Sequence, residues 1–196
     1  ISNGKLRIGW GQTGNSNIGA YAWGSAISRM PSELGMGYRP ANIANTAIQW
    51  ESQEQWNVGL DLGFLNDRIN LVVDWYKKTS NDMLMDLQLP SYMGTQGNGS
   101  SALAAPKGNY GSIENTGVEI AVTGVPVRTK DMELSISANF SWQKNKLLSL
   151  DGTYMGQNLS AKEYMNLGGM NGAGFIGGNN QVIYQMVGQP VGVFYL

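Results

Sequence analysis

The sequence predicts an all-β protein: a segment of an antiparallel transmembrane β-barrel with long extracellular loops and short periplasmic turns. Apolar and polar residues alternate with period two along several segments, which is typical of strands with one apolar and one polar face. These segments are longer than the ~5–6 residues usual in soluble sheets and match the ~9–11 residues with which a strand crosses a bilayer. Long and short connections alternate between them, as in barrels whose loops lie outside and whose turns lie inside.

The composition fits this fold class and argues against most enzymes. Charged residues make up only 14% of the chain, compared with ~25% in ordinary soluble domains, and glycine and aromatic residues are abundant. Cysteine and histidine are absent, which removes thiol chemistry, the commonest general base and the commonest metal ligand. We therefore predict no catalytic residue, no metal site and no cofactor. The net charge of −1 provides no basic surface for nucleic acid.

The first predicted strand contains Leu6, Ile8 and Trp10 in alternation with charged residues or glycine. The glycines from Gly9 to Gly14 also spell G-x-G-x-x-G, the spacing of a dinucleotide-binding turn. That motif needs a buried parallel strand before the glycines and a helix after them. Here the strand is amphipathic and the next residues have no helical period, so we interpret the glycines as the point where the strand bends into a long loop.

The next two strands show the clearest pattern. Large apolar residues occupy alternate positions in Trp56–Phe64 and again in Ile69–Trp75. With Asn66 and Asp67 as the loop residues of a tight hairpin, every apolar residue of one strand faces an apolar residue of the other. A single register therefore places all of them on one face.

Two further strands follow a long connection and are joined by a short turn near residues 125–131. Val118, Ile120 and Val122 alternate with polar or small residues, and the alternation in Met132–Gln143 has no interruption. Aromatic residues lie near the ends of the apolar rows, where membrane barrels carry aromatic belts. A sixth strand is expected near the C-terminus.

The alternation predicts which side chains face lipid and which face the lumen. The predicted lipid-facing residues are Trp56, Val58, Leu60, Leu62, Phe64, Ile69, Leu71, Val73, Trp75, Leu134, Ile136, Phe140 and Trp142. The predicted lumen-facing residues are Asn57, Asp61, Asn70, Asp74, Glu119, Ser135 and Asn139. Asp61 and Asp74 share a face, as the two carboxylates of a glycosidase do, but we favour ordinary water-facing residues. Arg7 is likewise expected to be a solvated lumen charge or part of a lining that guides substrate.

Three long loops are predicted, at residues 12–51, 80–115 and 146–189. They carry many aromatic side chains, which can stack on the apolar C–H faces of sugar rings or pack against other loops and partners. The substrate-binding residues are not identified by the sequence; Tyr21, Trp23, Tyr38 and Tyr92 are candidates.

Several segments, taken in order and with their spacing, resemble a known family. They are "LRIGWGQTGNSNIG" (Leu6–Gly19), "IQWESQEQWNVGLDLGFLNDRINLVVDWYKKTSNDML" (Ile48–Leu84), "NYGSIENTGVEIAV" (Asn109–Val122), "SISANFSWQKNKLLSL" (Ser135–Leu150) and "VGQPVGVFY" (Val187–Tyr195). The set is similar to the C-terminal half of the barrel in SusC/RagA-like TonB-dependent transporters of the bacterial outer membrane.

The resemblance implies that residues 1–196 form about six strands of a barrel that has roughly 22. It implies that the plug domain and the TonB-contacting segment are not present in this chain. It also implies energy-coupled import of glycans or peptides through TonB, and a SusD-like surface lipoprotein as partner.

Two alternatives from other classes remain open at this point. A soluble secreted β-sandwich that binds carbohydrate would pack the same apolar rows against a second sheet inside this chain. A passive porin would have the same barrel wall without energy coupling.

Overall fold

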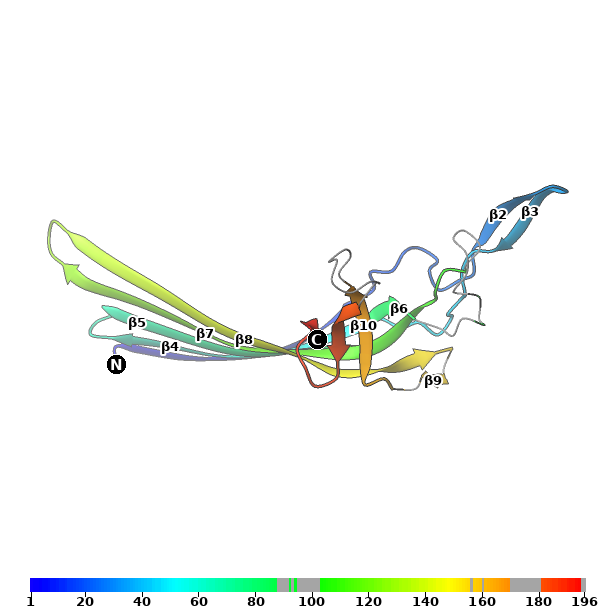
Figure 1. Ribbon diagram of the computed structural model, residues 1–196. Helices are drawn as coiled ribbons and strands as arrows, with labels where there is room; N and C mark the ends of the chain where they lie inside the picture. The colour runs from blue at the N-terminus through cyan, green and yellow to red at the C-terminus, as the bar shows by residue number, and fades with distance from the viewer. Residues whose placement is uncertain are drawn as a thin grey trace, which may run out of the picture.

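The structure is a computed structural model that describes residues 1–87, 92, 94, 103–155, 157–159, 161–169 and 181–194. Long antiparallel strands form one curved sheet, with smaller sheets and loops gathered at one of its ends (Figure 1). We call this the loop end, and the opposite end, which carries the tight turns, the turn end. Within the described residues, no helix is long and apolar enough to cross a membrane.

The main sheet has seven strands in the order β1-β4-β5-β7-β8-β9, with β6 paired to β7, and every pair is antiparallel. Its members are β1 (Asn3–Asn15), β4 (Glu51–Phe64), β5 (Ile69–Asn81), β6 (Leu84–Asp86), β7 (Lys107–Arg128), β8 (Glu133–Tyr154) and β9 (Gln157–Leu159). Two smaller sheets contain β2 (Ile27–Ser32) with β3 (Gly35–Pro40), and β10 (Tyr164–Gly169) with β11 (Gln181–Met186) and β12 (Val193–Phe194).

The predicted hairpin and its register are confirmed in β4 and β5. Phe64 pairs with Ile69, and the pairing continues without a shift to the other end of the hairpin. The turn is built from three consecutive residues with positive φ: Leu65, Asn66 and Asp67. Asparagine and aspartate tolerate this conformation better than most residues, which explains their presence at the turn.

The strands extend further toward the loop end than the apolar alternation predicts. β5 continues through the polar stretch to Asn81, and β7 and β8 each have 22 residues. Beyond the apolar rows the strict alternation ends, because β5 becomes polar on both faces while β7 and β8 carry Tyr110, Leu147 and Leu150 of a loop-end core. The sequence pattern therefore fades while the backbone ladder continues. The bend expected at the glycines of β1 is wrong, because β1 stays paired with β4 from Asn3 to Asn15.

The C-terminal strand differs in form from the expectation. It corresponds to β12, a two-residue strand paired with β11 in a separate small sheet. Tyr195, the last residue of the segment that resembles the family, lies outside the described residues. A hydrogen bond from the Leu147 amide to the Gln189 carbonyl, at 2.9 Å, links this part of the chain to β8.

The buried core lies at the loop end, on the loop-end parts of β7 and β8, and not between the apolar rows of the long strands. It consists of Leu87, Tyr110, Leu147 and Leu150, and Leu147 and Leu150 are almost completely inaccessible to solvent. Two buried asparagines hold the loop backbone around this core. Asn109 donates to the carbonyls of Gln49 and Asp82 at 2.9 and 3.0 Å and accepts from the Gln49 amide at 2.8 Å.

The second asparagine, Asn45, connects segments that are far apart in the sequence. Its side-chain amide donates to the Lys107 carbonyl at 2.9 Å, and its oxygen accepts from the backbone amide of Met155 at 3.3 Å. Because buried backbone groups need hydrogen-bond partners, these side chains replace a regular ladder where the loops leave the sheet. The loop end is therefore an ordered platform on top of the sheet.

Candidate functional site

Cross-strand pairing aligns residues of the five long strands into rungs, and successive rungs point to opposite faces of the sheet. One rung consists of Leu6, Leu60, Val73, Ile120 and Phe140. The next consists of Arg7, Gly59, Asp74, Glu119 and Ser141. We call the two sides the apolar face and the polar face.

The structure collects the predicted residues on these two faces. Register and alternation place all thirteen predicted lipid-facing residues on the apolar face and the seven predicted lumen-facing residues on the polar face. The apolar side chains are exposed or half-buried: Leu6 is 64% exposed and Phe140 is 62% exposed, while Val58 and Val73 are half-buried. In the described part of the chain no second sheet covers them, so the internal core expected of a β-sandwich is not formed.

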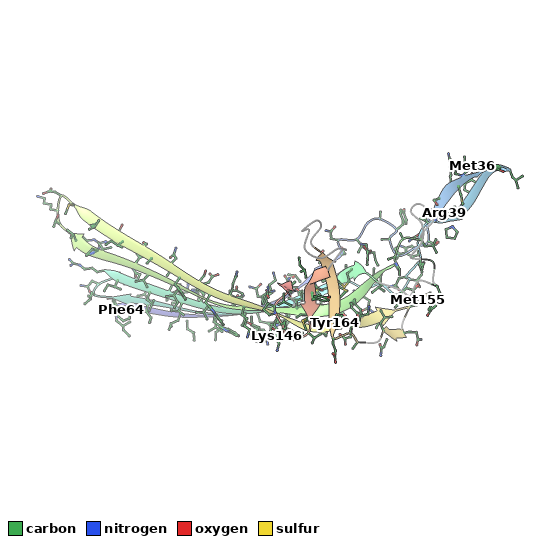
Figure 2. All side chains as sticks on the ribbon, viewed as in Figure 1. Met36, Arg39, Phe64, Lys146, Met155 and Tyr164 are labelled. Atoms are coloured by element: carbon green, nitrogen blue, oxygen red, sulfur yellow. The ribbon has the colours of Figure 1, made fainter. Side chains whose placement is uncertain are left out.

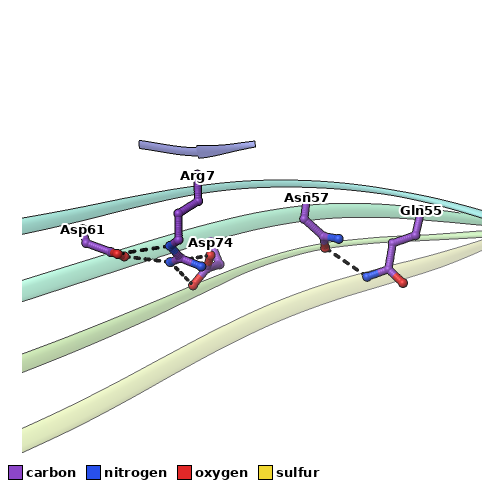
Figure 3. A network of polar contacts seen from close by, with 5 residues as sticks. All are labelled: Arg7, Gln55, Asn57, Asp61 and Asp74. Atoms are coloured by element: carbon purple, nitrogen blue, oxygen red, sulfur yellow. Dashed lines mark hydrogen bonds and ion pairs between the residues drawn. The ribbon is translucent and has the colours of Figure 1, made fainter. Parts of the chain in front are cut away.

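The centre of the polar face carries a three-residue charge network (Figure 3). Arg7 on β1 donates through Nε and Nη2 to the two carboxylate oxygens of Asp61 on β4, at 3.1 and 2.7 Å. The same Nη2 reaches Asp74 on β5, with its nearer carboxylate oxygen at 2.9 Å. A single guanidinium therefore joins three neighbouring strands.

The absence of a side chain at Gly59 makes this network possible. Gly59 lies between Arg7 and Asp74 in their rung, so the guanidinium crosses β4 directly above it. A methyl group at Gly59 would lie 2.7 Å from Arg7 Cζ and Nη2 and would also overlap Asp74. Glycine is needed here because the Arg7 guanidinium passes close to the β4 backbone, not because the backbone must be flexible.

We expect Gly59→Ala to displace Arg7 from Asp74 and to lower the stability of the sheet slightly, because exposed ion pairs contribute little. The measurement is a double-mutant cycle with Arg7→Ala in the full-length protein. In the Arg7→Ala background, Gly59→Ala should cost less, because the guanidinium it displaces is gone and Asp74 can turn away from the new methyl group. Additive costs would show that Gly59 has another role.

Toward the loop end, the polar face becomes rich in amides, with Lys78 in the rung between Gln55 and Asn115. Two hollows, of about 320 and 310 Å³, open there. The first is lined partly by Tyr76, Asn115, Gln143 and Asn145, and the second partly by Gln53, Gln55, Asn57 and Gly11. We call the six asparagines and glutamines at these hollows, Gln53, Gln55, Asn57, Asn115, Gln143 and Asn145, the amide wall. Each offers both a donor and an acceptor without net charge.

A larger hollow, of about 410 Å³, lies beside the charge network. Asp74, Glu119, Asn139 and Ser141 contribute to its lining. Glu119 is exposed and, among the described residues, forms no ion pair. The polar face thus presents a free carboxylate next to the neutral amide wall.

The apolar face ends in a tryptophan pair at the loop end. The rings of Trp10 and Trp56 are 6.2 Å apart between centroids. Both indole N–H groups donate to Oε1 of Glu54, at 2.8 and 3.0 Å. The ring bodies continue the apolar face while the N–H edges meet a charge, which is how tryptophan lies at a membrane–water boundary.

Two tyrosines outside the long apolar rows lie at the loop end, Tyr110 buried and Tyr154 partly buried. Burial raises the pKa of both Tyr110 and Tyr154, and the nearby charge of Asp151 raises that of Tyr110 further. Tyr154 donates its hydroxyl proton to the Ala44 carbonyl at 3.1 Å. Both phenols are neutral near pH 7, and their rings pack in or against the loop-end core.

Known proteins share this architecture. The chain matches the family described as TonB dependent receptor-like, beta-barrel over residues 1–195. It is 36% identical over 163 residues to the TonB-dependent receptor SusC of Bacteroides thetaiotaomicron, covering 78% of this chain and 15% of that protein. The chain belongs to the TonB-dependent receptor β-barrel family.

Other relatives agree with this assignment. The TonB-dependent receptor P39 of Formosa agariphila is 34% identical over 174 residues, covering 86% of this chain and 16% of that receptor. A solved structure of the RagAB peptide transporter superposes with a TM-score of 0.72 and 28% identity, covering 98% of this chain and 18% of that one. The chain therefore spans about a sixth of the length of these relatives.

Membership of the TonB-dependent receptor family, whose members are transporters, places this barrel segment in the bacterial outer membrane, as the resemblance implied. The Asp61 and Asp74 carboxylates agree with this, because both are bound to Arg7. In the described ranges, no three acidic residues come together to hold a metal ion.

The four aromatic residues predicted as substrate-binding candidates all present accessible rings. Tyr21, Trp23, Tyr38 and Tyr92 are all exposed, with Tyr21 82% and Tyr92 85% accessible. Tyr38 belongs to the β2–β3 hairpin, which projects away from the sheet (Figures 1 and 2). Each of the four therefore offers an exposed ring surface.

Sequence reasoning missed the Arg7 network and the amide wall. The signal for the network was present, because aligning Leu6 with Leu60 and Trp10 with Trp56 brings Arg7 opposite Gly59. The amide wall was harder to predict, because its residues come from different parts of the chain. They lie at polar-face positions of β4 and in the loop-end halves of β7 and β8.

Proposed function

We propose that residues 1–196 form part of the wall of an energy-coupled outer-membrane importer of glycans or peptides. The observation that carries this proposal is the continuous exposed apolar face across five strands, ending at the Trp10–Trp56 pair. Water would make such a face unfavourable, at about 25 cal/mol per Å² of apolar surface, whereas lipid removes this cost. Family membership supplies the transporter class.

In this proposal the apolar face meets lipid and the polar face lines the lumen. The lipid-facing set is the one predicted from alternation, including Leu60 and Phe140, and the lumen-facing set includes Asn57, Asp61 and Glu119. The Arg7 network would hold β1, β4 and β5 together where lumen water weakens single ion pairs.

The amide wall supports a hydroxyl- or amide-rich substrate. Asparagine and glutamine side chains can donate to and accept from sugar hydroxyls and peptide groups alike. One similar solved structure is that of a peptide transporter. The amide wall itself suits glycans and peptides equally. Glycans and peptides therefore both remain within the proposed class.

The proposed partners follow from the same family relationship. The loop-end platform and its exposed aromatic residues would face a SusD-like surface lipoprotein, and TonB would deliver energy through a plug domain inside the complete barrel. Nucleic acid has no part in this function.

Uptake of labelled oligosaccharides and peptides by cells that carry the full-length receptor tests this function. We expect uptake of one of these classes to stop when a protonophore collapses the inner-membrane proton gradient. Replacing Gln143 and Asn145 by alanine should lower uptake while leaving the amount of receptor in the outer membrane unchanged. Uptake that persists in the protonophore would contradict energy coupling and indicate a passive porin.

A further inference from the structure

We propose that the apolar face bears, next to its tryptophans at the loop end, a binding site for the phosphorylated headgroup of an outer-leaflet glycolipid. Lys144 and Lys146 are its phosphate-binding residues. The inference rests on the proposed function, because lipid reaches these lysines only if this face lies in the membrane.

The lysines belong to two rungs that continue the apolar face toward the loops. The first of these rungs aligns Trp56, Lys77, Thr116 and Lys144. The next aligns Glu54, Thr79, Glu114 and Lys146. Figure 2 shows Lys146 near the middle of the molecule, where the long strands meet the loop end, far from Phe64 at the turn end. Charge therefore replaces apolar side chains abruptly, within two rungs of Trp142.

The two carboxylates in these two rungs are already engaged, and Asp82 and Asp151 lie farther along, at the hollow described below. Glu114 forms an ion pair with Lys77, with Nζ and Oε2 2.9 Å apart. Glu54 accepts both indole protons of the tryptophan pair. Lys144 and Lys146 are exposed, and across the described ranges neither forms an ion pair. Two uncompensated positive charges are thus left side by side on the same face.

Their position matches the depth of a lipid phosphate. Trp142 precedes Lys144 by two residues on the same face of β8, so the ammonium groups lie just outside the aromatic boundary of the bilayer. Lysine places its alkyl stem along apolar surface and its charge in the headgroup layer. A basic cluster at this depth attracts anionic headgroups.

A polar hollow continues the site beyond the lysines. It measures about 480 Å³, and Asn81, Ser112, Ser149 and Asp151 contribute to its lining. Asn81 continues the row of Lys77 on β5, and Ser112 the row of Glu114 on β7. The Ser112 and Ser149 hydroxyls are hydrogen-bonded at 2.9 Å. Hydroxyl, amide and carboxylate groups suit sugar hydroxyls.

The order along the strands is therefore apolar side chains, tryptophan, free lysines and a polar hollow. A phosphorylated glycolipid offers matching groups, because its acyl chains lie below a headgroup in which phosphates and sugar hydroxyls are neighbours. A phospholipid without sugar would leave the hollow empty, and a soluble sugar phosphate would leave the apolar rows uncovered. This match favours a glycolipid of the membrane as the occupant.

The test is lipid retention by the full-length receptor in phosphatidylcholine nanodiscs that contain a trace of diphosphorylated lipid A, read by native mass spectrometry. The Lys144→Gln/Lys146→Gln variant should bind this lipid about thirtyfold more weakly, from about 1 kcal/mol for each lysine near an anionic surface. Glu114→Gln should bind it about fivefold more tightly, because it frees Lys77. Lys130→Gln, at the turn end of the β7–β8 hairpin, is the matched control and should leave binding unchanged.

Three results would overturn the site: equal retention by the double variant and the wild type, equal retention of dephosphorylated lipid A, or displacement of the lipid by inorganic phosphate. Heat-modifiable mobility on electrophoresis reports whether each variant is a folded barrel. Unchanged mobility and substrate uptake with unchanged lipid retention would reject the lipid site alone. A wild-type receptor that is not a membrane barrel would reject the proposed function itself.

Discussion

Replacement of Leu60 by arginine should destabilise the folded barrel by about 2–4 kcal/mol, the cost of a basic side chain on the lipid face near the bilayer midplane. Leu60 lies on β4 between Leu6 and Val73, in the central rung of the apolar face. In lipid, an arginine at this position has no water and no carboxylate within reach, because Glu54, the carboxylate of that face on β4, lies six residues away at the loop end. A folding titration of the full-length receptor in bilayers measures the effect.

Asn139→Arg is the matched control on the opposite face. Asn139 lies on β8 beside Ala121 and lines the hollow near Glu119, so the new guanidinium would remain hydrated. We expect a change within about 0.5 kcal/mol, as for most surface substitutions. Equal costs at Leu60 and Asn139 would contradict the assignment of the two faces.

Leu147→Ala should open the loop-end platform, with a local cost of about 2–5 kcal/mol. Leu147 is 0% exposed and packs in the cluster with Leu87, Tyr110 and Leu150. Its truncation leaves a cavity between β8 and the loops that the sheet cannot close. Hydrogen exchange is the measurement, because the Tyr110 and Leu87 amides are bonded to the Met83 and Pro106 carbonyls.

A local cost of about 2 kcal/mol or more should accelerate the hydrogen exchange of the Tyr110 and Leu87 amides about thirtyfold or more. Amides in the middle of β4 and β5 should keep their exchange rates. Leu34→Ala, at a fully exposed position in the β2–β3 turn, should have no effect. Uniform acceleration along the whole sheet would show that the platform and the barrel wall unfold together.

The long strands could be predicted from the sequence because the bilayer imposes a simple rule on them. Each residue of β4 and β5 faces either lipid or water, so alternation alone fixed the register from Phe64–Ile69 to Val58–Trp75. The rule weakens beyond Trp56 and Trp75, where both faces are wet. The full lengths of β7 and β8 were therefore missed.

The loop end and the polar network could not be predicted in the same way. Arg7 is separated from Asp61 and Asp74 by 54 and 67 residues, so their contact depends on the β1–β4 register as well as on facing. Asn45 reaches Met155 across 110 residues. A buried asparagine carries no local pattern, because its partners are backbone groups of distant loops.

Spin-label scanning of β5 tests the central claim, that the apolar face meets lipid, most directly. Single cysteines placed at successive positions of Ile69–Tyr76 in the full-length receptor, in a background without other cysteines, report contact with dissolved oxygen in lipid or with a nickel chelate in water. We predict strict alternation, with oxygen contact at Leu71, Val73 and Trp75 and nickel contact at Asn70 and Asp74. Absence of alternation, or oxygen contact at Asp74, would contradict the account.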